Sequence, residues 1–433
     1  MSNKQLILAL LIVSAIIHFA YFGHPSETVF DEVHFGKFVT GYYTHEYFFD
    51  IHPPLGKLIV AGFAKIFNFE PEYAFANIGE KYPDKQYLIL RFLPSLAGML
   101  LPIVIFLLAL QIGFGKTASF FAGMLVSLDN ALLVQSRFIL MDAFLLLFGF
   151  SALLMYFKRK YVWMAVFGGL AASVKWTGLT FLALPLILES IYFYTDRDWR
   201  TLIPKMVAFL FIPAAIYFSV FAIHFSLLNK SGAGDAFMSL EFQKTLAGSA
   251  YEKNGEIKKS NLFQKFTELN EEMYTSNARL TATHPYGSKW YTWPFMSRPI
   301  FYWVNGDQRI YFLGNPIIWW STTAALMYAL ISMIWSAGQS RKILIILLGG
   351  VGLNLLPFIG IPRVMFLYHY LSAFIFAILI LAYLIDQSQH KKLIAPVLIF
   401  ASAVSFIYFS PLSYGLNLSP REYNARVWLP SWR

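Results

Sequence analysis

Cysteine is absent from this 433-residue chain, which excludes disulfide bonds and thiolate metal sites. Charge is scarce as well: 13% of the residues are charged, whereas 57% are hydrophobic. A soluble domain of this length needs far more polar surface, so the scarcity of charge excludes one and indicates a polytopic membrane protein. Internal repeats and low-complexity tracts are also absent from the sequence.

Apolar runs long enough to cross a bilayer recur along the chain. A long apolar stretch at 161–195 is interrupted by SVKWTG, and two short spans that meet at Lys175 explain it better than one over-long helix. The first run follows Lys4 and has a cleaved signal peptide as its alternative reading. Counting it as retained, we predict an all-α protein with about eleven transmembrane helices. Besides the two short spans within 161–195, the spans are expected near 5–23 (the first run), 88–111, 117–135, 139–157, 206–228, 314–337, 342–360, 364–385 and 392–410.

The net charge of +10 is distributed in a way that predicts orientation. With the N-terminus inside, the inner connections hold twelve Lys and Arg residues against three acids. The first outer loop, 24–87, shows the reverse, with nine acids and five lysines. This is the positive-inside rule, so the basic balance reflects the lipid bilayer and excludes nucleic acid as a partner. The inner connections are 1–4, 112–117, 157–161, 195–205, 337–342 and 386–392.

Two outer segments are large. Loop 24–87 contains LGKLIVAGFAKIF at 55–67, whose apolar residues share one helical face and predict a helix lying in the membrane interface. The second segment begins polar and ends aromatic. We therefore expect three parts: an N-terminal transmembrane module at 1–228, an extracytoplasmic loop at 229–313, and a four-span module with an outer tail at 314–433.

Seven charged residues are left inside or at the edge of the predicted spans, and charge at membrane depth normally marks a cavity, a partner or a path. Pairing on adjacent spans is a structural alternative for Arg137 with Asp129 or Asp142. Three of the cations have no acid near them in the sequence, and cations at headgroup depth indicate a site for a lipid phosphate. The seven are Arg91, Asp129, Arg137, Asp142, Lys175, Glu189 and Arg363.

Asp31 and Glu32 enter the same outer compartment just after the first span. A carboxylate facing cations fits displacement at a sugar anomeric carbon, where the carboxylate deprotonates an acceptor hydroxyl and the cations stabilise a departing phosphate. Helix capping or a solvated loop is the alternative for this pair. Asp50 and His52, in DIHPPLGK, either orient a donor or cap a helix. These four residues lack a dependable ligand spacing, so we predict no metal and no cofactor.

Seven motifs, taken in order, resemble the protein O-mannosyltransferases, and they are distributed over nearly the whole chain. The resemblance implies a GT-C fold and an inverting transfer of mannose from a polyprenyl-phosphate carrier to Ser or Thr hydroxyls of secreted proteins, with the translocon as a candidate route of delivery. The motifs are FDEVHFGKF, DIHPPLGK, LRFLPSLAGML, LDNALLVQSRFILMDAFLLLF, SVKWTGL, HPYGSKWYTWPFMSRPI and PRVMFLYHYLSA.

The same resemblance assigns roles to individual residues. It implies catalysis by Asp31 with Glu32 beside it, and an essential cation at Arg91. The expected donor-phosphate residues are Arg91, Lys175, Arg363 and Arg137, and the expected donor- or acceptor-orienting residues are His52, Asp50, His284, Tyr286, Trp290 and His369.

One departure from the family pattern is the size of the second outer loop. Eukaryotic members carry β-trefoil MIR domains there, and 229–312 is too short for one. The chain therefore resembles a prokaryotic member without MIR domains, in a plasma membrane, with its site on the extracytoplasmic face. Two alternatives remain: a GT-C transferase acting on a lipid acceptor, and a lipid-sugar transporter. A transporter often shows inverted repeats and charges accessible from both sides, whereas these charges lie at one face.

Overall fold

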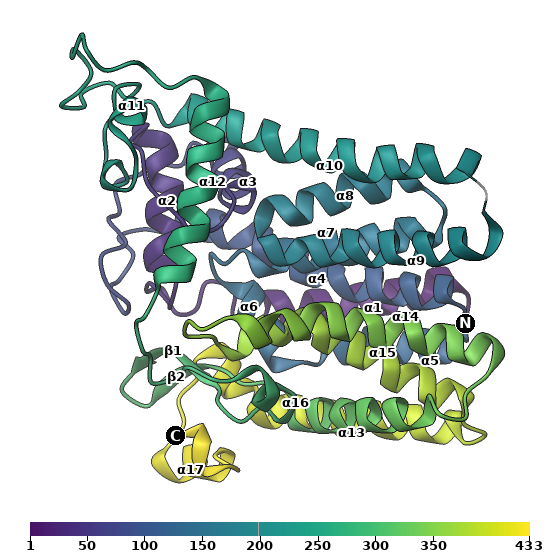
Figure 1. Ribbon diagram of the computed structural model, residues 1–433. Helices are drawn as coiled ribbons and strands as arrows, with labels where there is room; N and C mark the ends of the chain where they lie inside the picture. The colour runs from purple at the N-terminus through teal and green to yellow at the C-terminus, as the bar shows by residue number, and fades with distance from the viewer. Residues whose placement is uncertain (198) are drawn as a thin grey trace.

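The structure is a computed structural model that describes residues 1–197 and 199–433, so Asp198 of the predicted connection 195–205 lies outside the described residues. Long helices run alongside one another, and the smaller elements gather at one end of this bundle (Figure 1). The N-terminus lies at the opposite end from the β-hairpin and the C-terminus. The smaller elements therefore form a cap on one end of the bundle.

The N-terminal half supplies most of the long helices. Its consecutive helices pack in pairs, such as α4 with α5 and α7 with α8, because short connections return the chain alongside itself. The helices are α1 (Asn3–Phe19), α4 (Tyr87–Ile112), α5 (Lys116–Ser127), α6 (Asn130–Arg137), α7 (Asp142–Phe157), α8 (Tyr161–Val174), α9 (Thr180–Asp196) and α10 (Trp199–Leu227).

The C-terminal half adds four long helices. The most apolar stretch of one of them, α15, is 78% buried inside the protein, compared with 28% for that of α16 and 22% for that of α10. α15 is therefore an inner helix, and the other two present apolar surface to lipid. The four are α13 (Pro316–Ser332), α14 (Gly338–Leu355), α15 (Leu371–Gln387) and α16 (Lys391–Tyr414).

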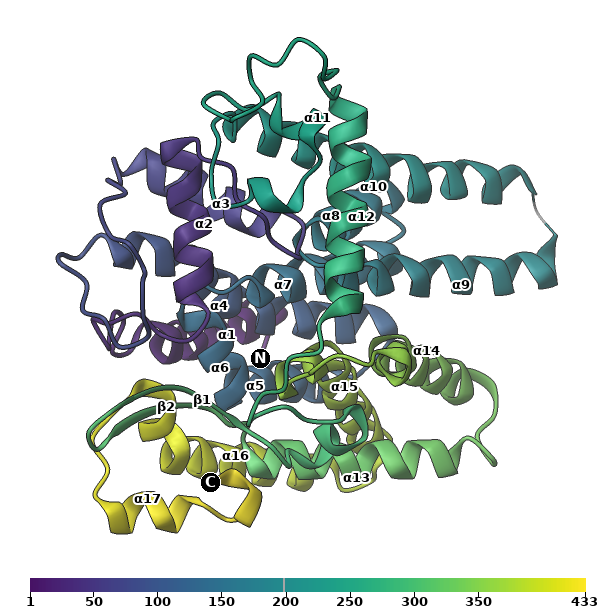
Figure 2. The same ribbon diagram turned by 60° about the vertical axis from the view of Figure 1, so that its left-hand side comes forward.

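The cap consists of short helices and one antiparallel hairpin. Ile300 pairs with Phe312 in the hairpin, and the register shifts between Phe301 and Trp303. Helix α12 stands across the end of the bundle (Figure 2). The cap elements are α2 (Glu32–Thr44), α3 (Leu55–Ile66), α11 (Leu240–Gln243), α12 (Leu262–Arg279), β1 (Ile300–Asn305), β2 (Gln308–Phe312) and α17 (Pro420–Arg426). Short 3-10 helices lie at Trp176–Leu179, Asp235–Phe237, Trp290–Phe295, Leu356–Gly360, Leu367–Tyr370 and Pro430–Trp432.

The predicted all-α bundle is confirmed. Among the described residues, six helices are long and apolar enough to cross a membrane, and the bent pair α5–α6 brings the number to seven. Four further apolar helices are shorter: α1, α7, α8 and α13. Each predicted span therefore has a helical counterpart, while the number of actual crossings stays a prediction.

The two breaks in the helices have local causes. The predicted break at Lys175 is confirmed: α8 ends at Val174, and Lys175 is extended before a 3-10 turn leads into α9. The span predicted at 117–135 contains a bend that the sequence did not indicate, because α5 and α6 meet at an angle of 56°. At this bend Asp129 is the N-cap of α6, and its side chain accepts a hydrogen bond from Leu132 N at 2.9 Å.

The helix predicted at 55–67 is confirmed, as α3, and its place in the membrane interface stays a prediction. Its small residues pack inward, including Gly56, Ala61 and Ala64, whereas Ile66 is 73% exposed. The apolar side chains that define its predicted face are thus only partly covered by protein. This arrangement suits a helix that rests on the cap and touches lipid with its outer side.

We expect Asp129→Ala to destabilise the protein. The Asp129 carboxylate also accepts hydrogen bonds from Asn315 N at 3.0 Å and from Trp319 Nε1 at 2.8 Å, which ties the bend to α13. Removing the carboxylate leaves three buried donors unsatisfied, at a cost on the order of 3 kcal/mol. Thermal unfolding in detergent measures this loss. Asp84→Ala, at an exposed position, is the control, and equal melting temperatures for the two variants would contradict the prediction.

Candidate active site

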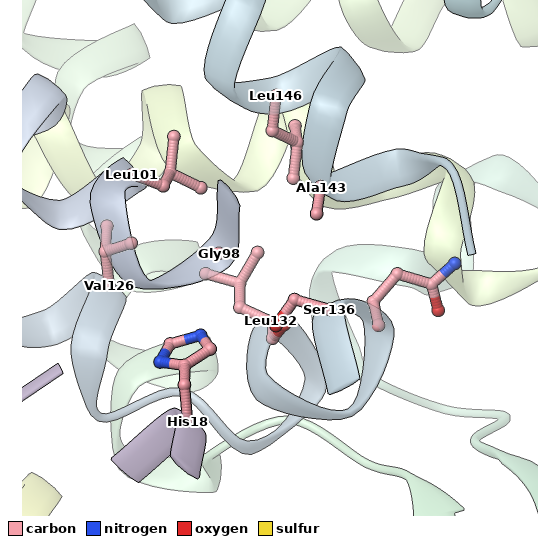
Figure 3. Close-up of a pocket in the computed structure, with 9 residues that line it drawn as sticks. His18, Gly98, Leu101, Val126, Leu132, Ser136, Ala143 and Leu146 are labelled. Atoms are coloured by element: carbon pink, nitrogen blue, oxygen red, sulfur yellow. The ribbon is translucent and has the colours of Figure 1, made fainter. Parts of the chain in front are cut away.

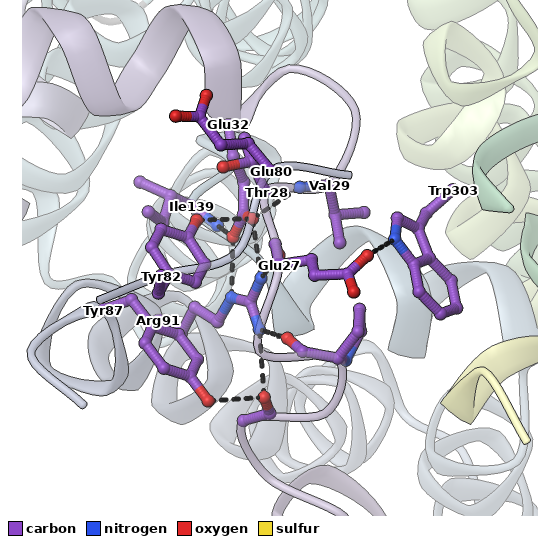
Figure 4. Close-up of polar contacts among 12 residues, drawn as sticks. Glu27, Thr28, Val29, Glu32, Glu80, Tyr82, Tyr87, Arg91, Ile139 and Trp303 are labelled. Carbon is purple, nitrogen blue, oxygen red and sulfur yellow. Dashed lines mark hydrogen bonds and ion pairs between the residues drawn. The ribbon is translucent and has the colours of Figure 1, made fainter. Parts of the chain in front are cut away.

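Asp31 and Glu32, at the start of α2, have different environments. Glu32 lies in the interior of the protein. Its side chain is fully buried. Arg91 of α4 donates two parallel hydrogen bonds to the Glu32 carboxylate, from Nε to Oε1 and from Nη2 to Oε2, both at 2.7 Å (Figure 4). Three further donors complete the set: Val29 N at 2.8 Å, Ile139 N at 3.0 Å and the Tyr82 hydroxyl at 3.0 Å.

Arg91 is fully buried and its remaining N–H groups are also occupied. Nη1 donates to the carbonyls of Pro25 at 2.7 Å and Gly23 at 3.4 Å, and Nη2 donates to the carbonyl of Glu27 at 2.8 Å (Figure 4). All five N–H groups of a guanidinium are thereby used. Arg91 therefore supports the turn that carries Asp31 and Glu32, here called the acidic turn. It has no N–H left for the expected donor phosphate.

Asp31 occupies the outer environment. Its side chain is partly exposed and, within the described part of the chain, accepts no hydrogen bond and forms no ion pair. Burial raises the pKa of Asp31 to about 7, and the neighbouring Asp142 and Asp50 add to the rise while Lys175 opposes it. A carboxyl group with this pKa suits a general base, because near neutral pH it is ionised yet still basic.

Lys175 lies at the break between α8 and α9, close enough to Asp31 to lower its pKa. Its Nζ donates to both carboxylate oxygens of Asp142 at 2.8 Å, and Gln135 Nε2 donates to Oδ2 of the same carboxylate at 2.7 Å. The ammonium also lies 5.6 Å from the ring centre of Tyr368. The cation that seemed unpaired in the sequence is therefore held by an acid from another helix, with 12% of its side chain still exposed.

The DIHPPLGK segment places a second ion pair near the first. Lys57 of α3 pairs with Asp50 and also donates to the carbonyl of His52 at 2.9 Å. Burial lowers the pKa of His52 well below its usual value, and the cations Lys175, Lys57 and Arg363 lower it further. His52 is therefore a neutral imidazole, able to donate or accept a hydrogen bond without adding charge.

The C-terminal half contributes the segment around Arg363. Arg363 is partly buried, and no ion pair or side-chain hydrogen bond joins it to the residues that the structure describes. His369 has a structural environment instead: its Nδ1 lies 2.9 Å from the Phe366 carbonyl and its ring stacks on Trp293. Arg363 thus remains available to an anion, while His369 is fixed by its neighbours.

The aromatic segment lies beside the same part of the chain. The exposed ring of His284 packs against Phe366 at 5.1 Å between centroids. Tyr286 contacts Phe301 of β1 at 5.8 Å, and Trp290 is partly buried beside Tyr291. The structure thus brings 284–290 next to the segment that carries Arg363.

Arg137 lies elsewhere. It donates to the carbonyls of Ala20 at 2.7 Å and Tyr21 at 2.8 Å, and it stacks on Tyr414. The alternative pairing with Asp129 or Asp142 is not formed. Arg137 therefore caps the end of α1, and its expected contact with the donor phosphate has no geometric support here.

Two residues of the cluster carry no signal in the sequence. Gln135 and Tyr302 are uncharged and lie 167 positions apart, yet the Tyr302 hydroxyl donates to Gln135 Oε1. Asp142 was noted for its charge but was not expected at the site. The place of Gln135, Tyr302 and Asp142 in the site is known only from their contacts in the structure.

Metal ligands do not gather in the described part of the chain, where no three His, Asp or Glu residues form a group that could hold an ion. A small cavity lies deeper in the bundle (Figure 3). It is lined mostly by apolar residues, with His18, Gln135 and Ser136 as polar members of the wall. Neither Asp31 nor Lys175 lines it, whereas Gln135 belongs both to its wall and to the cluster around Asp31.

The apolar helices and the comparison with solved structures together define the class: an integral membrane protein of the GT-C fold. The Saccharomyces cerevisiae protein O-mannosyltransferase Pmt1–Pmt2 complex bound to the sugar donor superposes with a TM-score of 0.93 at 20% identity, covering 100% of this chain and 93% of that one. The Archaeoglobus fulgidus oligosaccharyltransferase matches with a TM-score of 0.58 at 12% identity, covering 98% and 57%. At these identities the likeness shows the fold alone.

Sequence comparison then gives the family. The model described as dolichyl-phosphate-mannose-protein mannosyltransferase matches residues 8–229, and the C-terminal four TMM region of protein-O-mannosyltransferase matches 262–432. This chain belongs to the protein O-mannosyltransferase family, as its motifs indicated. Protein O-mannosyltransferase 1 of Drosophila melanogaster is 37% identical over 52% of this chain. Dolichyl-phosphate-mannose–protein mannosyltransferase 4 of Schizosaccharomyces pombe is 35% identical over 59%. The matches span 28% and 36% of these two relatives.

We expect Arg91→Ala to lower the melting temperature strongly, because it leaves the Glu32 carboxylate buried without its cation, at a cost of about 3–5 kcal/mol. Arg91→Lys should recover only part of the stability, since lysine lacks the fork that bonds both oxygens. Thermal unfolding in detergent measures both. Lys85→Ala, at an exposed position in the same outer loop, is the control. A fully stable Arg91→Ala protein would show that Arg91 is not structural.

Proposed function

We propose that this protein transfers mannose from a polyprenyl-phosphate carrier to Ser or Thr hydroxyls of proteins, with inversion at the anomeric carbon. Family membership and the names of the relatives support the donor and acceptor classes. The observation that carries the proposal is Asp31: a carboxylate without a partner among the described residues, with a pKa of about 7 and a cation near it. A flippase has no need of such a base.

In the proposed reaction Asp31 takes the proton of the acceptor hydroxyl as its oxygen attacks C1 of the sugar. The bond between C1 and the phosphate oxygen breaks, and polyprenyl phosphate leaves with the electron pair. Lys175 and Arg363 stabilise the charge that develops on the phosphate. A phosphate leaves as a stable anion, so a single carboxylate suffices and no acid has to protonate the leaving group.

The other residues of the site have supporting roles in this proposal. Glu32 and Arg91 position the turn that presents Asp31, and neither contacts substrate. The Asp50–Lys57 pair and the neutral His52 line the side of the site formed by the first outer loop. His284, Tyr286 and Trp290 lie over the acceptor side, and His369 holds the segment of Arg363 in place.

The same proposal includes the topology. The site lies on the extracytoplasmic face of a prokaryotic plasma membrane, with the N-terminus in the cytoplasm and residues 1–228, 229–313 and 314–433 as the three parts. The basic connections of the sequence and the position of the N-terminus at the end opposite the cap support this orientation. Acceptors reach the site as secreted chains, with the translocon as the proposed route.

Radiolabelled polyprenyl-phosphate-mannose tests the activity. Membranes containing the protein should transfer label to protein, and the label should be released by treatments that cleave O-linked sugars. Asp31→Asn should reduce transfer at least about a hundredfold, because a general base contributes roughly 10²–10⁴ in rate. Label found only in lipid would overturn the protein acceptor, and an active Asp31→Asn variant would overturn the base.

The pKa of Asp31 predicts a pH dependence. The base must be ionised, so kcat/KM should rise with pH up to about 7 and then level off. The folded-state pKa lies above the ordinary value of 3.8, so ionisation of Asp31 costs stability as the pH rises from about 4 to 7. Asp31→Asn should therefore melt above the wild type at about pH 8 and with it at about pH 4. A kcat/KM that is constant between pH 5.5 and 8 would contradict this assignment.

A further inference from the structure

The hairpin of the second outer segment lies directly against the acidic turn. Phe30, the residue before Asp31, donates its backbone N–H to the Tyr302 carbonyl at 3.0 Å, and the two rings stack at 3.9 Å with 5° between their planes. Phe30 has a φ of +48°, a left-handed conformation that is unfavourable for a bulky residue. The contact with Tyr302 therefore holds Phe30 in a backbone conformation that it would otherwise leave.

The hydroxyl of Tyr302 connects the hairpin to a second part of the site. It donates to Gln135 Oε1, and Gln135 Nε2 donates to Asp142 Oδ2 at 2.7 Å. The same carboxylate receives Lys175 Nζ at 2.8 Å. Tyr302 is 1% exposed, so no water can replace its hydroxyl without a rearrangement of the site.

We propose that Tyr302 is a positioning residue that sets the separation between the base Asp31 and the cation Lys175. Its ring and carbonyl fix the turn that carries the base. Its hydroxyl fixes the orientation of the Gln135 amide, and thereby the carboxylate that holds the cation. This role rests on the proposed function, since it concerns the residues assigned to proton transfer and to the donor phosphate.

The two halves of the role can be separated by substitution. Tyr302→Phe keeps the stacked ring and the carbonyl and removes only the hydroxyl. The Gln135 amide is then free to turn, and Lys175 loses part of its orientation toward the donor. Tyr302→Leu removes the stacked ring as well, so Phe30 and with it Asp31 also lose their support.

Steady-state kinetics in detergent, with polyprenyl-phosphate-mannose and an acceptor peptide, should show a split. For Tyr302→Phe we expect the donor KM to rise about three- to tenfold, the equivalent of one hydrogen bond, and kcat to fall by a smaller factor, because Lys175 acts on the phosphate in the bound donor and in the transition state. For Tyr302→Leu we expect kcat to fall as well, at least about tenfold, because a displaced base slows the chemical step. A merely structural tyrosine would lower the amount of folded enzyme and leave the KM of the surviving fraction unchanged.

Tyr311→Phe is the matched control. Tyr311 is a buried tyrosine of the same hairpin whose ring stacks on Phe301 and whose hydroxyl donates to the Trp432 carbonyl at 2.5 Å. Its loss should lower the melting temperature about as much as Tyr302→Phe does, and it should leave the donor KM at the wild-type value. An equal rise in donor KM for both variants would overturn the proposal.

A double-mutant cycle tests the route through Gln135. If Tyr302 acts through this amide, Gln135→Leu should raise the donor KM, and Tyr302→Phe should add no more than about twofold in that background. Fully additive effects, or an unchanged KM in Tyr302→Phe, would overturn the proposal while wild-type transfer still supports the proposed function. Absence of transfer by the wild type would instead count against the proposed function itself.

Discussion

The ion pair between Arg91 and Glu32 is the interaction on which the candidate active site depends. Both side chains are fully buried, so each would be costly to keep without the other. Five hydrogen bonds to the Glu32 carboxylate join the loop before α2, the segment before α4, helix α4 itself and the segment before α7. Successive side chains at a helix start point in different directions, about 100° apart. With Glu32 fixed toward the interior, Asp31 is directed to the other side.

This division explains how two adjacent carboxyl groups acquire different properties. The Glu32 carboxylate accepts five hydrogen bonds and has a structural role. Burial is the main cause of the raised pKa of Asp31; the like charges of Asp142 and Asp50 add to the rise, and Lys175 opposes it. A pair of carboxyl groups whose environments differ in this way is a recurrent arrangement in enzymes, where one group does chemistry and the other holds it in place.

The sequence predicted the parts of the molecule that depend on local pattern. Hydropathy located the apolar helices of the bundle but not α12 of the cap, the interruption at Lys175 located a real break, and the amphipathic run after His52 located α3. What it could not supply was partners from distant segments. Arg91 and Lys175 have no acid near them in the sequence, and the fold pairs them with Glu32, 59 positions away, and Asp142, 33 positions away.

Tyr302 and Gln135 gave no signal, because an uncharged residue in an aromatic-rich chain is indistinguishable from a packing residue until its hydrogen bonds are known. The bend at Asp129 was missed for a related reason: a capping carboxylate inside an apolar run looks like an unexplained charge.

The acidic turn is held from two sides by different parts of the chain. Arg91 of α4 donates hydrogen bonds to Glu32 on one side. On the other side, the hairpin of the second outer segment contacts the turn: Trp303 Nε1 and Asn305 Nδ2 donate hydrogen bonds to the Glu27 carboxylate at 2.8 and 3.1 Å. The base therefore depends on contacts that cross the boundary between the expected modules 1–228 and 229–313. Arg363 comes from a third part, 314–433. A site assembled in this way from all three segments ties the placement of the base to the folding of the whole chain, so these modules describe the order of the sequence and are not independent functional units.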